Sequence, residues 1–440
     1  MSYLDKNKIF HSKNEGLIFG KYRMNLEESY KNLCLIAPTG SGKTTRYVIS
    51  NILKCTGSVV VTDPSGEIYE KTSAHLKEQG YTIQVLAPAD LQNSSRFNPL
   101  SRCKNKQDIK RLASILGAFN ADKEDFWTTG ATSIIFVCLV GLYNLSKQTE
   151  EADKCSIGAL RIFLNSFGVS GEGIKDVLKN NLNPAEWLEF MAFISQDDKV
   201  ISGMLSTAKV ALDLWSDQNV IDFSTTNTVD IEALRNTKTI VYVILPEHKV
   251  KYYSLLVNLF YSFCFEHCLE HSKGNSVFFF LDEFGNMGKI RDFEIISTTL
   301  RKRKCSISII LQAHSQLEAV YGRMNAETIW SGGMAHTLFF GGLGLKTCKD
   351  LEQILGNYTQ EGIVSAKADD RDRTVAVGTP LMSADQIRMM SNKEAVLISS
   401  NQKPIKLNMK PYYEDSTLLK WSKKKIPEQK LLLESPKLSA

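Results

Sequence analysis

Apolar and polar residues follow two alternating patterns over the first hundred positions. Short apolar runs rich in β-branched residues occupy 33–37, 58–63 and 82–87. The stretches between them, 44–54 and 66–80, have helical periodicity. Continuous apolar strands separated by helices are typical of a parallel sheet covered on both faces. We therefore predict an α/β fold with a mostly parallel sheet.

The strand pattern resumes in the second half of the chain. It returns in five apolar runs, at 239–246, 276–283, 306–313, 336–342 and 394–400. Between 103 and 220 the chain has helical periodicity and no convincing strand. This arrangement predicts one split α/β domain that is interrupted by an inserted all-α domain.

Two further stretches are polar. Residues 359–378 predict a loop, and the lysine-rich end predicts a basic, solvated tail rather than a specific nucleic-acid arm. The predicted parts are residues 1–102 and 221–415 for the α/β domain, 103–220 for the all-α domain and 416–440 for the tail.

The composition is that of a soluble globular protein, with 43% hydrophobic and 23% charged residues. A net charge of +5 permits a polyanionic partner without arguing strongly for one. The nine cysteines include no CxxC pair and predict reduced, buried thiols of a cytosolic protein. The apolar segment 131–145 is too short to span about 30 Å of hydrocarbon, and 252–271 is interrupted by polar residues, so both predict buried helices.

The first predicted strand leads directly into a phosphate-binding sequence. "APTGSGKT" matches the P-loop pattern, with Ala37 at the first glycine position. In this pattern backbone N–H groups converge on phosphate, Lys43 reaches the β- and γ-phosphates, and the Thr44 hydroxyl holds Mg²⁺. The predicted nucleotide-binding residues are Pro38, Thr39, Gly40, Ser41, Gly42, Lys43, Thr44 and Thr45.

Carboxylate and amide side chains follow two later strands. In "VFFFLDEF" we expect Asp282 to assist Mg²⁺ and Glu283 to polarise the attacking water. Gln312 ends the next apolar run, where an amide can hydrogen-bond the γ-phosphate or the water. The alternative for Asp282 and Glu283 is an ordinary solvated strand end, and the alternative for Gln312 is a capping polar residue.

Two more patterns allow both a functional and a structural interpretation. "LRKRK" carries Arg301 and Arg303, which could project into a neighbouring subunit's nucleotide site or simply complement a helix dipole. "HCLEH" fits the H-x-x-E-H pattern of zinc peptidases through His267 and His271. No further acidic ligand helix is evident there, so we favour histidines that complement a helix end.

Together these motifs resemble a known family, the conjugative coupling proteins of type IV secretion systems. Members are RecA-like ATPases that feed relaxase-bound DNA into a secretion channel. The likeness covers residues 15 to 415, and its quoted stretches are "GLIFGK", "LIAPTGSGKTT", "GSVVVTDPSGEIYEKT", "RFNPL", "DFWTTGA", "LDEFGNMGKI", "IILQAHSQLEAVYG" and "KPIKLNMKPYYED". The resemblance implies a RecA-like nucleotide-binding fold that uses ATP and Mg²⁺.

The resemblance also implies roles for single residues. Lys43 and Thr44 match the family's Walker A positions, Asp282 and Glu283 its Walker B pair, and Gln312 its glutamine after the next strand. Arg301 falls where the family's Arg-Gly-Tyr-Gly stretch begins, but "KRK" follows it here. The family's usual "DPKGE" is "DPSGE" in this chain, with Ser65 in place of lysine, so nothing more than a place near the nucleotide is implied for Asp63 and Glu67.

The partners implied by the resemblance are single-stranded, relaxase-linked DNA and a secretion channel or membrane-anchored protein. The all-α domain resembles a substrate-reading module for relaxase and accessory proteins, and the active state is expected to be a homo-hexamer. The N-terminal sequence has no apolar anchor of the kind many members carry. We therefore expect a cytoplasmic protein, or one held at the inner face of the plasma membrane by a partner.

Two other functions stay open on the sequence alone. One is a duplex-DNA translocase of the same fold that is not tied to secretion. The other is a non-catalytic adaptor that binds nucleotide as a structural switch. DNA-stimulated hydrolysis without relaxase binding would favour the first, and bound ATP that stays unhydrolysed would favour the second.

Overall fold

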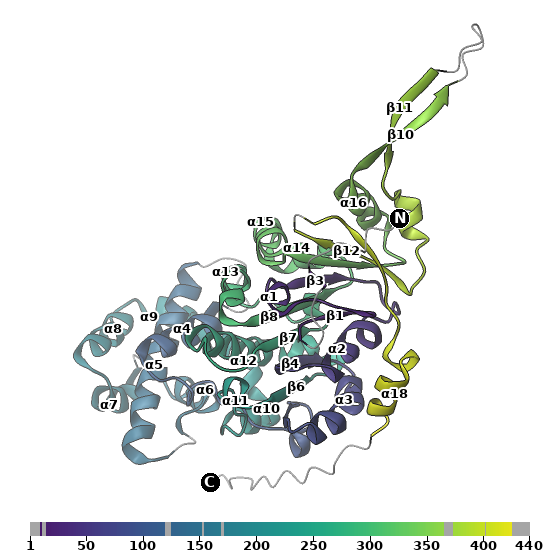
Figure 1. Ribbon diagram of the computed structural model, residues 1–440. Coiled ribbons are helices and arrows are strands. Elements are labelled where there is room, and N and C mark those ends of the chain that lie inside the picture. Colours follow the sequence, from purple (N-terminus) through teal and green to yellow (C-terminus); the bar gives the residue numbers. More distant parts are fainter. Residues whose placement is uncertain are drawn as a thin grey trace. The chain divides into compact units, whose positions relative to one another are not determined.

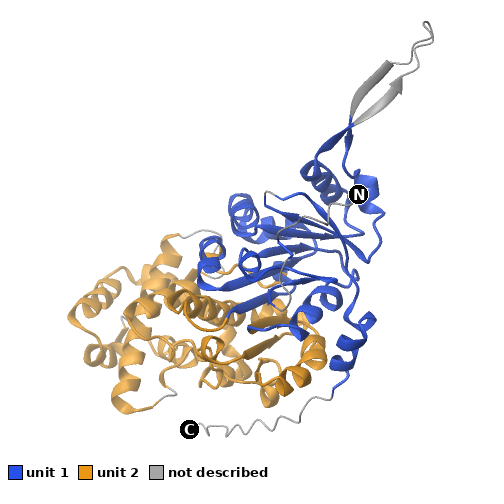
Figure 2. Ribbon diagram, viewed as in Figure 1, with its two compact units in different colours: residues 1–57, 276–285, 294–424 blue, residues 58–275, 286–293, 425–440 orange. Residues whose placement is uncertain are grey.

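The chain folds into two compact units in the computed structural model (Figures 1 and 2). The structure describes residues 9–10, 15–118, 125–151, 154–168, 171–364, 373–400 and 402–424. Unit 1 consists of residues 1–57, 276–285 and 294–424, and unit 2 of residues 58–275, 286–293 and 425–440. Each unit therefore combines segments that are far apart in the sequence. The domain boundaries placed at 102, 220 and 415 stay a prediction.

The main sheet strands of unit 1 are six, in the order β13-β12-β9-β3-β8-β7. The strands are β3 (Leu33–Ile36), β7 (Val277–Leu281), β8 (Cys305–Leu311), β9 (His336–Phe340), β12 (Glu394–Ser399) and β13 (Ile405–Asn408). The strand β3 is parallel to β8 and β9, and β7 is parallel to β8, whereas β12 pairs antiparallel with β9 and β13. The parallel strands are buried along their whole length, which explains their mostly apolar sequences.

Short helices and a small hairpin complete unit 1. The hairpin pairs β1 (Ile18–Phe19) with β2 (Tyr22–Arg23). The α-helices are α1 (Leu26–Ser29), α2 (Ile49–Leu53), α13 (Phe293–Thr299), α14 (His314–Tyr321), α15 (Arg323–Glu327), α16 (Leu345–Leu355), α17 (Ala384–Arg388) and α18 (Ser416–Ser422). Single turns are η2 (Thr44–Val48), η8 (Phe284–Asn286), η9 (Leu300–Arg303), η10 (Thr328–Gly333) and η11 (Tyr412–Glu414).

The prediction of a loop over residues 359–378 is wrong. Most of this stretch lies in the antiparallel strands β10 (Asn357–Val364) and β11 (Arg373–Pro380), with Asn357 opposite Pro380 and Val364 opposite Arg373. The pairing joins backbone groups, so a polar sequence can form such a hairpin. The alternation of apolar and polar residues that would have predicted the strands is not required.

The first residues of the predicted tail are helical, and the boundary at 415 stays a prediction. Residues Ser416–Ser422 form α18, and Asp415 caps this helix by accepting from the backbone N–H groups of Thr417 and Leu418. Leu418 is buried, which ties the helix to the fold. The rest of the predicted tail, from 425, lies outside the described residues.

Unit 2 has a three-stranded parallel set with β6 in the middle. Here β6 (Thr239–Ile244) pairs with β4 (Ser58–Asp63) and β5 (Thr82–Leu86). The helix α3 (Glu67–Glu78) connects β4 to β5, and η7 (Glu247–Lys249) and α12 (Val250–Glu270) follow β6. The strands predicted from the apolar runs are confirmed in both units.

Between β5 and β6 the described residues form helices and no strand. These are η3 (Leu91–Asn93), α4 (Lys106–Ala118), α5 (Phe126–Thr149), α6 (Ile157–Asn165), α7 (Glu172–Asn181), α8 (Pro184–Ile194), α9 (Asp198–Ala211), η6 (Asp213–Ser216), α10 (Gln218–Ser224) and α11 (Ala233–Asn236). The helical character predicted for 103–220 is confirmed for this part of the chain. Its role in substrate recognition stays a prediction.

The helix α5 is the long apolar element of this helical region. Asp125 accepts from the Thr128 backbone N–H at 2.8 Å, and the Thr128 hydroxyl accepts from the Asp125 N–H at 2.9 Å, which forms a capping box. Among the described residues it alone is long and apolar enough to cross a membrane, but 56% of its most apolar window is buried in the fold. It packs against α4, α7 and α9, as a core helix does.

Candidate functional site

The carboxyl ends of β3, β7 and β8 meet at one edge of the unit 1 strands. Ile36, the last residue of β3, lies opposite Leu311, the last residue of β8, and the Ala37 N–H donates to the Leu311 carbonyl at 2.9 Å. Since β7 is parallel to β8, with Leu281 opposite Ile309, Asp282 and Gln312 leave these strands at the same edge of the sheet. Three segments that are distant in the sequence therefore leave the sheet together.

The loop after β3 has the backbone of a phosphate cradle. Gly40 and Gly42 have φ values of 76° and 77°, a left-handed region that favours glycine. The loop is closed by bonds from the Ser41 N–H to the Pro38 carbonyl at 3.2 Å and from the Thr45 hydroxyl to the Gly42 carbonyl at 3.1 Å. The helical turn η2 starts directly afterwards at Thr44, so its free N–H groups face the loop.

The two carboxylates after β7 contact the two P-loop side chains that were expected to meet phosphate and metal. The Thr44 hydroxyl donates to Oδ2 of Asp282 at 2.9 Å. The Lys43 ammonium forms an ion pair with Oε1 of Glu283. Burial raises the pKa of Asp282 to about 6, although the Lys43 charge and the Thr44 hydroxyl both act to lower it. The Asp282 carboxyl therefore lies in a setting of low polarity.

Glu283 has an unusual backbone. Its φ is +55°, in the left-handed region that residues other than glycine rarely adopt. The Glu283 N–H donates to Oδ1 of Asp282 at 3.0 Å, which helps to hold this conformation. Two residues later, a Cβ on Gly285 would stand 2.8 Å from Cβ of Gln316. Packing thus fixes the turn that directs the Glu283 carboxylate toward Lys43.

Gln312 joins the same cluster. Its Nε2 donates to Oε2 of Glu283 at 3.2 Å, and its backbone N–H donates to Oε1 of Gln316 at 2.8 Å. Sequence reasoning missed Gln316, which positions Gln312 from the first turn of α14. The spacing of two glutamines four residues apart after a predicted strand was the available signal.

These residues fit a bound nucleotide and Mg²⁺. Oγ of Ser41 is buried and has no hydrogen-bond partner among the described residues, as suits a cradle that bonds a ligand. Asp282 and Thr44 supply the hard oxygen ligands that Mg²⁺ prefers, and Mg²⁺ commonly takes its remaining ligands from phosphates and water. Lys43 and Glu283 flank the place where the terminal phosphate would lie.

Arg301 does not join this cluster. It lies in the exposed turn η9 before β8, whereas Gln312 follows the far end of that strand. A seven-residue strand separates them by roughly 23 Å. Arg301 therefore does not reach the site of its own chain, and its action in a neighbouring subunit stays a prediction.

The residues Asp63 and Glu67 lie in unit 2. Oδ2 of Asp63 accepts from the Tyr69 backbone N–H at 2.8 Å, and the Ser65 hydroxyl accepts from the Glu67 N–H at 3.3 Å. Both bonds stabilise the start of α3. Burial raises the pKa of the Asp63 carboxyl.

The histidine pattern at the end of α12 does not form a metal site. The rings of His267 and His271 stack with their centroids 4.5 Å apart. Within the described ranges, no group of three or more histidine, cysteine, aspartate or glutamate side chains is placed to hold a metal ion. Burial and the neighbouring His271 lower the pKa of His267 to about 4.

Comparisons with known sequences agree with the motifs. Residues 3–438 match the family described as type IV secretory system conjugative DNA transfer. Protein VirD4 of Rhizobium rhizogenes is 24% identical over 433 residues, which cover 94% of this chain and 63% of that protein. The probable conjugal transfer protein TraG of Sinorhizobium fredii is 22% identical over 399 residues, which cover 84% of this chain and 60% of that protein. The chain thus spans less than two thirds of the length of these relatives.

Comparisons with solved structures agree with the fold. The bacterial conjugative coupling protein TrwBdeltaN70 superimposes with a TM-score of 0.71 at 18% identity, over 91% of this chain and 90% of that one. The plasmid coupling protein TrwB in complex with ADP and Mg²⁺ gives 0.69 at 19% identity, with the same coverage. VirB4 of Thermoanaerobacter pseudethanolicus gives 0.56 at 11% identity, over 94% of this chain and 100% of that one. The predicted RecA-like α/β fold is confirmed.

Proposed function

Since this chain belongs to the type IV secretory system conjugative DNA transfer family, we propose that it is a coupling ATPase that brings relaxase-bound DNA to a secretion channel. The proposal rests on one observation above the others. A phosphate loop, two carboxylates and an amide from three separate strand ends converge within hydrogen-bonding distance. A P-loop alone indicates binding, whereas this cluster also has the groups that hydrolysis needs.

Each side chain has a distinct task in this proposal. The backbone N–H groups of 39–44 and the Lys43 ammonium hold the phosphates, and the Thr44 hydroxyl with Asp282 holds Mg²⁺. When bound, Mg²⁺ neutralises charge on the phosphate oxygens. Glu283 orients the attacking water and accepts its proton, and Gln312 holds the Glu283 carboxylate in place. Phosphate binding exchanges the Lys43 partner from Glu283 to phosphate oxygen, which frees Glu283 for the water.

Support for ATP and Mg²⁺ comes from the fit of the site and from related structures. TrwB has been solved with ADP and Mg²⁺, with a non-hydrolysable ATP analogue and with a non-hydrolysable GTP analogue. The Lys43→Ala variant tests the proposal directly. It should lose nucleotide binding, hydrolysis and DNA transfer together, because the ammonium is the main charge facing the phosphates. Transfer at the wild-type rate with this variant would refute the proposal.

The partners follow from the family. We propose single-stranded, relaxase-linked DNA as cargo, relaxase and accessory proteins as ligands of the helices in 103–220, and a homo-hexamer as the active state, working at the cytoplasmic face of the membrane with a channel partner. Arg301 would then act in the neighbouring subunit's site. Hydrolysis stimulated by DNA in the absence of relaxase binding would instead favour a translocase outside secretion. Bound ATP that stays intact in the presence of DNA and partners would favour a nucleotide-switched adaptor.

A further inference from the structure

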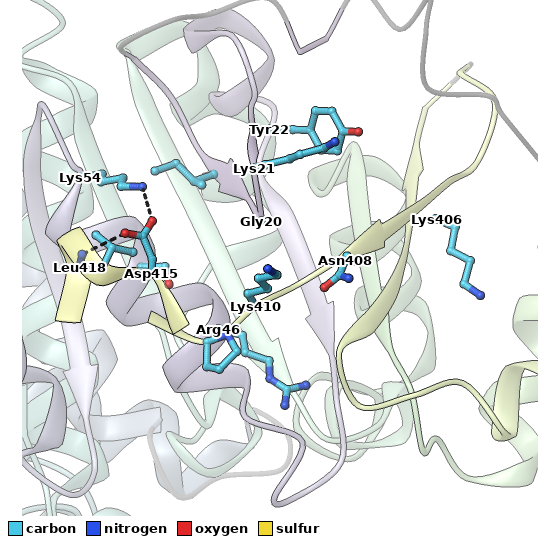
Figure 3. A pocket seen from close by; sticks show the side chains of 13 residues that line it. Gly20, Lys21, Tyr22, Arg46, Lys54, Lys406, Asn408, Lys410, Asp415 and Leu418 are labelled. Carbon is cyan, nitrogen blue, oxygen red and sulfur yellow. Dashed lines mark hydrogen bonds and ion pairs between the residues drawn. The ribbon is translucent and has the colours of Figure 1, made fainter. Parts of the chain in front are cut away.

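The strand β3 connects the P-loop at one edge of the unit 1 strands with a buried asparagine, Asn32, at the opposite edge. Beside the P-loop edge lies a cavity of about 510 Å³, with walls from the β1–β2 hairpin, from η2 and α2, and from the segment that links β13 to α18 (Figure 3). Arg46 of η2 lines the cavity, and its N–H donates to the Gly42 carbonyl at 2.9 Å. The cavity therefore adjoins the nucleotide site described above, whereas Asn32 lies apart from it.

Asn32 is fully buried and joins β3 to three other elements. Its Nδ2 donates to the Ser297 carbonyl of α13 at 2.6 Å and to the Gly333 carbonyl of η10 at 3.0 Å. Its Oδ1 accepts from the Ile307 N–H of β8 at 2.9 Å. Its φ is +60°, in the left-handed region, which asparagine adopts more readily than most residues. A single side chain thus satisfies three backbone groups of buried residues.

Two of these bonds lie on either side of the basic turn η9. Ser297 lies three residues before the turn begins at Leu300. Ile307 lies four residues after the turn ends at Arg303. The Leu300 side chain is itself buried, which fixes the start of the turn. The turn is therefore held at its base by Asn32 and by its own leucine.

The side chains that this turn carries are exposed at Arg301 and Lys302. In the part of the chain that the structure describes, Arg301 has no hydrogen-bond or ion-pair partner. The P-loop of the same chain lies at the other edge of the strands, so a nucleotide phosphate that Arg301 contacts belongs to another molecule. A long side chain on a loose turn would sample many positions, and an anchored base reduces this freedom.

We propose that Asn32 is a positioning residue for hydrolysis in the neighbouring subunit, because it holds η9 where Arg301 meets the phosphates of that subunit's nucleotide. The inference rests on the proposed function, which supplies the ring of subunits and the nucleotide. An arginine stabilises the transferring phosphate only when its guanidinium is well placed, and a misplacement of about 1 Å can cost about 100-fold in rate. Asn32 touches no reacting atom, so it acts through Arg301.

A purely structural role for Asn32 predicts a different outcome. Loss of the amide would then loosen unit 1 as a whole and weaken nucleotide binding in the same chain. The positioning role instead predicts intact nucleotide binding in the altered chain and slow hydrolysis at the site next to it. Binding and turnover therefore separate the two roles.

Asn32→Gly tests the two roles in the full chain. Glycine adopts a φ of +60° without strain and lacks the amide. We expect the variant to bind Mg²⁺-ATP within about twofold of the wild type and to hydrolyse it about 10- to 100-fold more slowly. Tyr30→Phe is the matched control, because the Tyr30 hydroxyl is hydrogen-bonded at 2.5 Å to Ser276, which precedes β7 at the same edge. This control should keep both binding and hydrolysis.

Mixtures of inactive variants identify the residue through which Asn32 acts. An Asn32→Gly chain keeps its P-loop, and a Lys43→Ala chain keeps its turn η9. In an equimolar mixture about a quarter of the interfaces combine an intact loop with a well-placed arginine, so part of the hydrolysis should return. Mixtures of Asn32→Gly with Arg301→Ala should stay inactive, because neither chain supplies a well-placed arginine. Recovery in the second mixture, or none in the first, would overturn the proposal.

Asn32→Asp is a second variant that does not depend on the folding of the glycine variant. The carboxyl group keeps an acceptor for the Ile307 N–H but offers at most one donor in place of two. It should slow hydrolysis by at least about fivefold with ATP binding retained, and it should give the same pattern in mixtures. Wild-type hydrolysis in both variants would overturn the proposal. Loss of ATP binding in both would assign Asn32 to the stability of unit 1 and would overturn it as well.

The wild-type chain separates a failure of this inference from a failure of the proposed function. A wild type that neither binds nor hydrolyses Mg²⁺-ATP would refute the proposed function, and the role of Asn32 with it. A wild type that hydrolyses ATP, together with an Arg301→Ala variant of unchanged rate, would leave the proposed function standing and would overturn the role of Asn32 alone.

Discussion

Gln312 donates from Nε2 to Oε2 of Glu283 at 3.2 Å, so the residues that follow β8 and β7 are coupled directly. The other Glu283 oxygen is engaged by Lys43. The Glu283 carboxylate therefore contacts both Lys43 and Gln312, the residue that follows β8. The bond between Glu283 and Gln312 thus lies close to the start of α14, which begins two residues after Gln312.

Gln312→Ala should slow hydrolysis more than it weakens binding. The amide holds the carboxylate but does not form part of the phosphate loop, so we expect kcat to fall by about 10- to 100-fold with little change in ATP affinity. Steady-state hydrolysis together with equilibrium binding measures both. Ser315→Ala, at an exposed position in the first turn of α14, is the control. Equal loss of binding and turnover would contradict this role.

At position 283 we expect glycine to give a more stable protein than alanine, the reverse of the usual order. At a φ of +55°, Glu283→Gly should be more stable than Glu283→Ala by about 1 kcal/mol, although both lose the carboxylate. Scanning calorimetry of the two variants measures the difference. At Lys423, where φ is −86°, glycine should instead be less stable than alanine. The same order at both positions would argue against backbone strain at Glu283.

His267 predicts a loss of stability in mild acid. Burial and His271 lower its folded pKa to about 4, below the ordinary value of 6.5, so the unfolded chain binds the extra proton first. Stability from the neutral ring is complete above pH 6.5 and is lost as the pH falls toward 4.

Thermal melting between pH 7 and pH 4.5 measures this effect, with an expected contribution of about 2 kcal/mol from His267. The charged groups around the ring include Glu232, which favours the proton, and Lys104 and Arg235, which oppose it. The His267→Gln variant should have a flatter melting profile over this range. An unchanged slope would show that other groups dominate.

Arg301 predicts complementation between subunits. Lys43→Ala blocks a site in its own subunit, whereas Arg301→Ala should block the site next to it. Mixtures of the two inactive variants should therefore recover part of the ATPase activity through interfaces that combine an intact loop with an intact arginine. Lys302→Ala, the next position in the same turn, should stay active alone. Mixtures as inactive as their parts would argue against a trans role.

The sequence revealed those features that depend on local pattern. The P-loop, Asp282 and Gln312 could be located because each directly follows a buried apolar strand, and parallel strands place such ends together. The hairpin of β10 and β11 and the short strand β13 were not predicted, because backbone pairing stabilises them more than an apolar pattern does.

Other features depend on contacts between distant segments. The left-handed backbone of Glu283 lies two residues before the close contact of Gly285 with Gln316, and no local propensity encodes either feature. The cavity beside Arg46 needs both ends of the chain, so neither end shows it alone. The family resemblance includes a motif from each of these two segments, "GLIFGK" and "KPIKLNMKPYYED". The motifs do not indicate that the two segments lie together in the fold.

The most direct test of the central claim is a single-turnover measurement on Glu283→Gln with Mg²⁺-ATP and single-stranded DNA. The substitution keeps the shape of the side chain but removes the base that activates water. We predict ATP binding close to that of the wild type and a hydrolysis step slower by at least about 100-fold. Hydrolysis at the wild-type rate would contradict the account, because the convergence of Lys43, Glu283 and Gln312 would then not form the hydrolytic site.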